Sequence, residues 1–85
     1  MIKTEPGDEV DARGLLCPLP VLRLRKRLMS VAPGTRLRLI ATDPAAVVDV
    51  PHFCAEGGHV MVEMRELEDG ARAFTVERGP GRRAD

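Results

Sequence analysis

The chain has 85 residues, 44% of them hydrophobic and 31% charged, which indicates one small folded domain and excludes a disordered segment. Its 13 basic and 13 acidic residues cancel, its two cysteines are too few for a disulfide scaffold, and its two phenylalanines, without Tyr or Trp, exclude an aromatic platform for sequence-specific nucleic-acid binding. No apolar run approaches the roughly 20 residues of a membrane helix, and no signal-peptide pattern opens the sequence, so we expect a cytoplasmic protein without membrane contact.

Two elements are predicted in the first third of the chain, behind a polar segment at 1–8 that we expect to be flexible. Residues 9–12 have the pattern of a short strand, which Arg13-Gly14 ends. From 18 to 31 the apolar residues recur at the spacing of a helix, and Pro33-Gly34 ends that pattern.

A second strand and a second, interrupted helix are predicted in the middle of the chain. Residues 35–41 alternate between apolar and basic, and the apolar ones are expected to face the core: Leu37, Leu39 and Ala41. Asp43-Pro44 is typical of a helix start, but Pro51 is unfavourable inside a helix. We therefore expect a short turn at 45–48 and the main helix from 50 to 56.

The last third of the chain predicts a hairpin. Residues 59–68 alternate, and three apolar ones are expected to face the core: Val60, Val62 and Met64. Asp69-Gly70 is typical of a two-residue turn, followed by a strand at 71–78 and a flexible tail at 80–85. The order β-α-β-α-β-β predicts an α+β fold at 9–79, a two-layer sandwich with two helices on one face of a four-stranded mixed sheet.

The residues that indicate chemistry lie between the first strand and the first helix, in the sequence Gly14-Leu15-Leu16-Cys17-Pro18-Leu19-Pro20. Pro18 and Pro20 fall in the first helical turn, where proline removes no hydrogen bond, so the helix starts rigidly beside Cys17. The helix dipole and nearby arginines favour the thiolate, and we expect the pKa of Cys17 to lie below its ordinary value. Alternatively, Cys17 is a buried structural cysteine, which the pattern alone leaves open.

The segment D-A-R-G-L-L-C-P-L-P at 11–20 resembles the D-x-x-G-x-x-C-P-x-P signature of the TusA/SirA-type sulfur-carrier family, without a departure. Further segments extend the resemblance, in order and spacing, over roughly residues 9–79: A-P-G at 32–34, D-P-A at 43–45, D-V-P-H-F-C at 49–54 and G-G-H at 57–59. The resemblance implies a sandwich like the C-terminal domain of a bacterial translation initiation factor, in agreement with the predicted order of elements.

The resemblance also implies a sulfurtransferase activity. The motif cysteine, here Cys17, would accept a sulfane sulfur as a persulfide, with Gly14, Pro18 and Pro20 as its structural support. A cysteine desulfurase or a rhodanese-type protein would be the sulfur donor. A DsrE-type or other protein would be the acceptor, in tRNA thiolation, molybdenum-cofactor maturation or sulfur oxidation.

Basic residues are concentrated around this motif. Seven basic and no acidic residues occur at 13–38, whereas seven acidic residues and one arginine occur at 43–69. The domain can therefore present a basic face at zero net charge. Four of the basic residues are candidates for partner docking or for stabilising the thiolate: Arg13, Arg23, Lys26 and Arg27. Alternatively, they form a solvated helix face.

The second thiol, Cys54, has apolar neighbours on the second predicted helix, and we expect it in the core. Together with Cys17, His52 and His59 it lacks the paired spacing of a structural zinc site, so no metal site is predicted. The sequence contains no glycine-rich phosphate loop, and no cofactor is expected. The alternative to a persulfide carrier is a non-catalytic thiol-based regulator, or an RNA-associated module that uses the basic helix.

Overall fold

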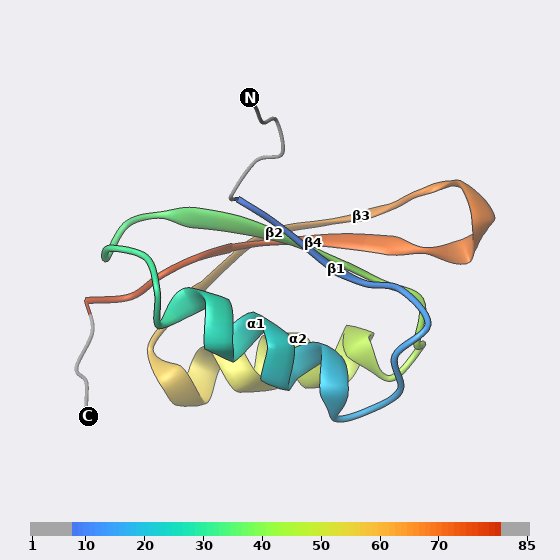
Figure 1. Cartoon of the computed structure of the whole chain (residues 1–85), viewed down its shortest axis with the longest axis horizontal. Coiled ribbons are helices and arrows are strands. Elements are labelled where there is room, and N and C mark those ends of the chain that lie inside the picture. The colour runs from blue at the N-terminus through green and yellow to red at the C-terminus, as the bar shows by residue number, and fades with distance from the viewer. Residues whose placement is uncertain (1–7, 81–85) are drawn as a thin grey trace.

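A computed structural model describes residues 8–80, which form two layers (Figure 1). A four-stranded sheet has the order β1-β2-β4-β3, and two helices cover one of its faces. The elements are β1 (Glu9–Ala12), α1 (Leu19–Leu28), β2 (Arg36–Ala41), α2 (Ala46–Gly57), β3 (Val60–Glu66) and β4 (Arg72–Glu77). The predicted two-layer α+β sandwich is confirmed, whereas most of the terminal segments expected to be flexible, 1–8 and 80–85, lies outside the described residues.

The strands β1 and β2 run parallel, and the other two pairs in the sheet are antiparallel. A parallel pair requires a crossover connection, which α1 provides. In the register of this pair Ala12 lies opposite Ala41, the last residues of their strands. The loop that follows β1 and the loop that follows β2 therefore begin side by side at one end of the sheet.

The core lies between the sheet and the two helices. The helices contribute Leu24 and Leu28 from α1 and Ala46, Val50 and Cys54 from α2, at the spacing of one helical face. The sheet contributes Leu37, Leu39 and Ala41 from β2, as the alternation predicts. It also contributes Phe74 and Val76 from β4, and each of the five is at most 2% exposed. No helix within residues 8–80 has the length and apolar character needed to cross a membrane.

The second helix is continuous, so the expected separation into a turn at 45–48 and a helix at 50–56 is wrong. Asp43 secures its start, because its carbonyl oxygen accepts the Ala46 N–H at 3.0 Å and its Oδ1 accepts the Ala45 N–H at 3.1 Å. Pro51 lies on the exposed side of the helix. Burial of the opposite, apolar side offsets the one hydrogen bond that this proline removes.

The first helix is shorter than the 18–31 predicted. Pro18 is its N-cap, and its last residue is Leu28. The Arg27 carbonyl oxygen accepts hydrogen bonds from both the N–H of Ser30, at 3.0 Å, and its hydroxyl, at 2.8 Å. A serine that competes for a helix carbonyl in this way favours the end of the helix.

The expectation that three apolar residues of β3 are buried in the core is wrong. Three residues predicted to be buried are 38% to 53% exposed: Val60, Val62 and Met64. The pairing with β4 shifts between Met61 and Glu63, so the alternation of a regular strand does not hold across this point. Met61 packs against the core instead. Met64 pairs with the core residue Phe74 but stays 43% exposed, in a hairpin that extends past the helices (Figure 1).

The hairpin turn between β3 and β4 is confirmed, but it is one residue longer than the two residues expected. It comprises Glu68–Gly70, and the N–H of Leu67 donates to the carbonyl oxygen of Ala71 at 2.8 Å across it. Asp69 and Gly70 have φ values of 71° and 79°, a region that aspartate tolerates and glycine adopts without strain.

We predict that Cys54→Ala lowers the free energy of unfolding by about 1 kcal/mol, because it removes one buried sulfur-sized group. Cys54 is 2% exposed, and burial raises its pKa to about 11, so a neutral thiol fills this part of the core. Chemical denaturation measures the change. Val48→Ala on the exposed side of the same helix is the control and should stay within about 0.5 kcal/mol of wild type; equal stability of the Cys54 variant would contradict the prediction.

Candidate functional site

Cys17 lies in the loop between β1 and α1, and its side chain is exposed. This exposure excludes the alternative of a buried structural cysteine. The peptide bond between Cys17 and Pro18 is cis. Pro18 is the N-cap of α1 and Pro20 is buried in its first turn, as the sequence predicts for a rigid helix start.

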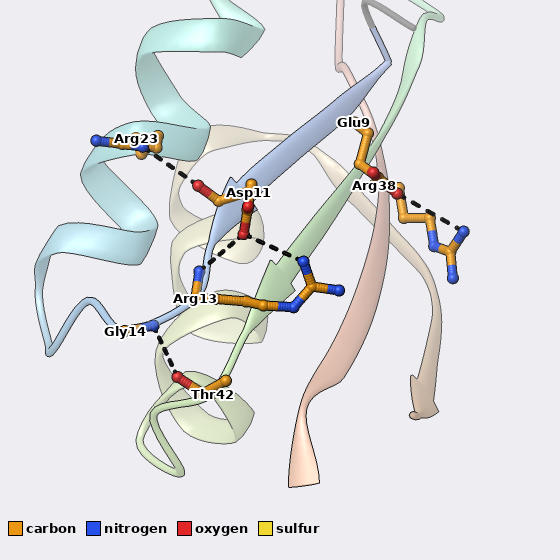
Figure 2. A network of polar contacts seen from close by, with 7 residues as sticks. All are labelled: Glu9, Asp11, Arg13, Gly14, Arg23, Arg38 and Thr42. Carbon is orange, nitrogen blue, oxygen red and sulfur yellow. Dashed lines mark hydrogen bonds and ion pairs between the residues drawn. The ribbon is translucent and has the colours of Figure 1, made fainter. Parts of the chain in front are cut away.

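Two hydrogen bonds join this loop to the connection between β2 and α2. The Gly14 N–H donates to Thr42 Oγ1 at 2.9 Å (Figure 2), and the Cys17 N–H donates to Asp43 Oδ2 at 2.6 Å. The other carboxylate oxygen of Asp43 accepts the Ala45 N–H. One side chain therefore connects the backbone of the cysteine to the start of α2. Gly14 has a φ of 80°, which favours glycine at this position of the motif.

Carboxylates determine the electrostatics of the thiol. Asp49, in the first turn of α2, accepts a hydrogen bond from the Cys17 thiol, and this is the main cause of a raised pKa of Cys17. The negative charges of Asp49 and Asp43 raise the pKa further. The lowered pKa expected from the helix dipole and the arginines is therefore wrong, because a hydrogen bond to the protonated form and nearby negative charge outweigh the dipole.

Three of the four basic residues considered for docking or thiolate stabilisation contact β1 instead. Arg23 donates to the carbonyl oxygen of Asp11 at 3.2 Å, and Arg13 lies 3.6 Å from the Asp11 carboxylate (Figure 2). Arg27 donates to the carbonyl oxygen of Glu9 at 3.4 Å. Because β1 is an edge strand, the contacts of Arg23 and Arg27 supply donors to a backbone that has a neighbouring strand on one side only.

Two exposed apolar side chains are sequence neighbours of Cys17 and Asp49. Leu16 precedes Cys17 and is 69% exposed, and Val48 precedes Asp49 and is 71% exposed. Lys26, the fourth basic candidate, is exposed on α1. Single exposed apolar residues are ordinary, but exposed apolar residues that adjoin the residues of a reactive site are typical of a surface that a protein partner covers.

The four side chains weighed as metal ligands occupy different environments. Cys17 is exposed and Cys54 is in the core. His52 lies 3.4 Å from a glutamate carboxylate on the surface of α2, and His59 Nδ1 accepts the Gly79 N–H at 2.9 Å. Within residues 8–80, no three His, Cys, Asp or Glu side chains are grouped so that they could hold a metal ion.

Sequence reasoning missed Thr42 and Asp43 as partners of the backbone around Cys17, and Asp49 as a neighbour of the thiol. It interpreted Asp43 only as the start of a helix and assigned no role to Asp49. The available signal was topological, because a parallel β1–β2 pair places the polar residues after β2 beside the loop after β1.

Known proteins match this chain over almost its whole length. The family model described as "Sulfurtransferase TusA" matches residues 8–78. The sulfur carrier protein TusA of Pseudomonas paraeruginosa is 47% identical over 76 residues, covering 88% of this chain and 95% of that protein. The one of Allochromatium vinosum is 41% identical over 70 residues, covering 82% and 91%. The crystal structure of a SirA-like protein from Desulfitobacterium hafniense, 24% identical, has the same fold, with a TM-score of 0.75 over 84% of this chain and 96% of that one.

We predict that the alkylation rate of Cys17 rises with pH only above the ordinary thiol range, because Asp49 opposes deprotonation. Asp49→Asn removes the negative charge and supplies an amide N–H that can donate to the thiolate, so its profile should shift to lower pH. Glu56→Gln removes an exposed carboxylate from the same helix and should leave the profile unchanged. Rates with iodoacetamide, assigned to Cys17 by peptide mass, measure this; a wild-type midpoint below about 8.5 would contradict it.

Proposed function

Because this chain belongs to the sulfurtransferase TusA family, we propose that it is a sulfur carrier that accepts a sulfane sulfur as a persulfide on Cys17 and passes it to an acceptor protein. The resemblance that the sequence analysis drew from its motifs is confirmed by the family match over residues 8–78. The observation that carries the assignment of Cys17 is its placement, an exposed thiol in the C-P-L-P segment, fixed at the start of α1 by the Asp43 carboxylate.

The proposed reaction is an exchange between a thiol and a persulfide. The Cys17 thiolate attacks the outer sulfur of the donor, R–S–SH, so that the S–S bond of the donor breaks while a new S–S bond forms on Cys17. The released R–S⁻ takes up the proton that Cys17 lost. One S–S bond replaces another, so the step needs no external oxidant or reductant, and the same exchange then transfers the outer sulfur to an acceptor thiol.

The raised pKa suits a carrier more than a general nucleophile. Between encounters with partners, Asp49 keeps the free thiol protonated and slow to react. Once loaded, Cys17 is a poor leaving group, because a thiol of higher pKa departs more slowly when another thiol attacks the outer sulfur. Small thiols should therefore remove the sulfur slowly. The alternative of a redox-sensing regulator has less support, because sensor cysteines have low pKa values.

A sulfur carrier requires a protein that donates sulfur and a protein that receives it. From the family resemblance we propose a cysteine desulfurase or a rhodanese-type protein as donor, and a DsrE-type or other protein as acceptor. The proposed setting is the cytoplasm, in tRNA thiolation, molybdenum-cofactor maturation or sulfur oxidation. Gly14, Pro18 and Pro20 are proposed to hold the loop in the conformation that presents the thiol.

The basic side chains of α1 are proposed to contribute to docking to different extents. Arg23 and Arg27 already donate to β1, and Arg13 is paired with Asp11, so their loss would also affect the edge of the sheet. Lys26 is exposed on the same helix and can meet an acidic group of a partner without breaking a contact to β1.

We predict that Cys17→Ser abolishes sulfur acceptance and leaves the fold intact, because an exposed hydroxyl replaces the thiol and cannot form a persulfide. After incubation with a cysteine desulfurase and cysteine, the wild type should gain about 32 Da on the peptide that contains Cys17, and a reducing agent should remove this mass. Cys54→Ala is the control and should still be loaded. A serine variant that gains the same mass would contradict the assignment.

We predict that Lys26→Glu slows sulfur transfer from the donor protein severalfold at low salt, with little change in the rate of Cys17 alkylation. Because exposed charges are screened over about 8 Å at physiological ionic strength, added salt should slow the wild type more than the variant. Arg38→Glu is a charge reversal on β2, away from α1; it also breaks the Arg38–Glu9 pair, and sulfur transfer should keep the wild-type rate. Equal transfer rates for wild type and Lys26→Glu would assign Lys26 to a solvated surface.

A further inference from the structure

The immediate surroundings of the thiol are acidic, although the segment at 13–38 has only basic charges. Asp43 approaches Cys17 from the connection after β2, and Asp49 approaches it from the first turn of α2. Arg13, the basic residue nearest in sequence on the loop, is paired with Asp11, and Arg23 of α1 donates to β1 (Figure 2). At the thiol itself a sulfur donor therefore meets the carboxylates of Asp43 and Asp49, whereas the exposed Lys26 lies in the last turn of α1.

We propose that this site selects its sulfur donor by charge: it takes sulfur from a protein persulfide that has a positively charged side chain beside it, and disfavours free sulfur anions such as thiosulfate or polysulfide. The inference rests on the proposed function and names the class of donor for it. Two carboxylates beside the thiol attract a cationic donor and repel an anionic one.

A positively charged partner group would also prepare the thiol for attack. Opposite charge placed beside Asp49 offsets the negative field that opposes the thiolate, so deprotonation becomes easier when such a partner docks. The exposed Leu16 and Val48 support a protein donor, because a protein surface buries apolar side chains that a small anion leaves in water. Activation would then occur in the complex and not in the free carrier.

Two thiol reagents of equal chemistry and opposite charge test the preference: the trimethylammonium-ethyl and the sulfonato-ethyl methanethiosulfonates. Their rates with Cys17, each divided by the rate with N-acetylcysteine amide, give a normalised ratio. We expect this ratio to be about tenfold in favour of the cation at low salt. It should approach one in 1 M salt, where the Debye length is about 3 Å. A ratio near one at low salt would overturn the inference.

Variants locate the origin of the ratio. Asp49→Asn should reduce it severalfold, and the double variant Asp43→Asn with Asp49→Asn should reduce it further. The control, Glu56→Gln with Glu63→Gln, removes two exposed carboxylates elsewhere and should preserve the ratio. If the control lowered the ratio as much as the Asp49 variants do, the effect would come from net charge. The assignment of charge selection to Asp43 and Asp49 would then be wrong. The salt series on the wild type gives the same test if the Asp43 variant does not fold.

Sulfur loading separates this inference from the proposed function. Cysteamine persulfide, which carries an amine, and mercaptopropionate persulfide, which carries a carboxylate, are the two probes, and the gain of one sulfur on Cys17 is the readout. We expect faster loading from cysteamine persulfide, by about the ratio found with the methanethiosulfonates. Equal loading by both would overturn the charge selection and leave the carrier function standing. Loading by neither would contradict the carrier function itself, and this inference with it.

Discussion

The hydrogen bond from the Cys17 amide to the Asp43 carboxylate is the contact on which the site depends. It is possible because β1 and β2 are parallel and in a register that ends both strands together, with Ala12 opposite Ala41. The same carboxylate accepts the Ala45 N–H at the start of α2, and this helix brings Asp49 to the thiol one turn later. Position and electrostatics of the cysteine thus have one structural origin.

This arrangement explains why the pKa of a thiol at the start of a helix is raised here. A helix N-terminus favours a thiolate, but its effect is modest and falls off within one turn. Two carboxylates on the neighbouring connection and helix oppose it, and they raise the pKa of Cys17. For a sulfur carrier, slow reaction with small molecules is an advantage, because sulfur has to reach a chosen acceptor. The chemistry of transfer then depends on what a partner brings to the site.

Much of the fold could be predicted from the sequence, because local patterns determine it. The alternation in β2 predicts Leu37, Leu39 and Ala41 as core residues, and the C-P-L-P segment predicts the start of a helix directly after Cys17, where α1 begins. The sequence predictions were wrong where contacts between distant parts of the chain determine the structure. Before the register shift of β3 the residue packed against the core is Met61 and not Val60, and burial of one helix face stabilises α2 across its proline. Asp49 was missed for the same reason, since 32 residues separate it from the thiol.

Amide hydrogen exchange of Cys17 tests most directly whether Asp43 fixes the loop. In the wild type the Cys17 amide should be protected, because Asp43 Oδ2 accepts it at 2.6 Å. In Asp43→Ala this protection should be lost, while the amides of Leu39 and Phe74 in the central strands keep theirs. A Cys17 amide that stays protected in Asp43→Ala, or one that exchanges freely in the wild type, would contradict the account.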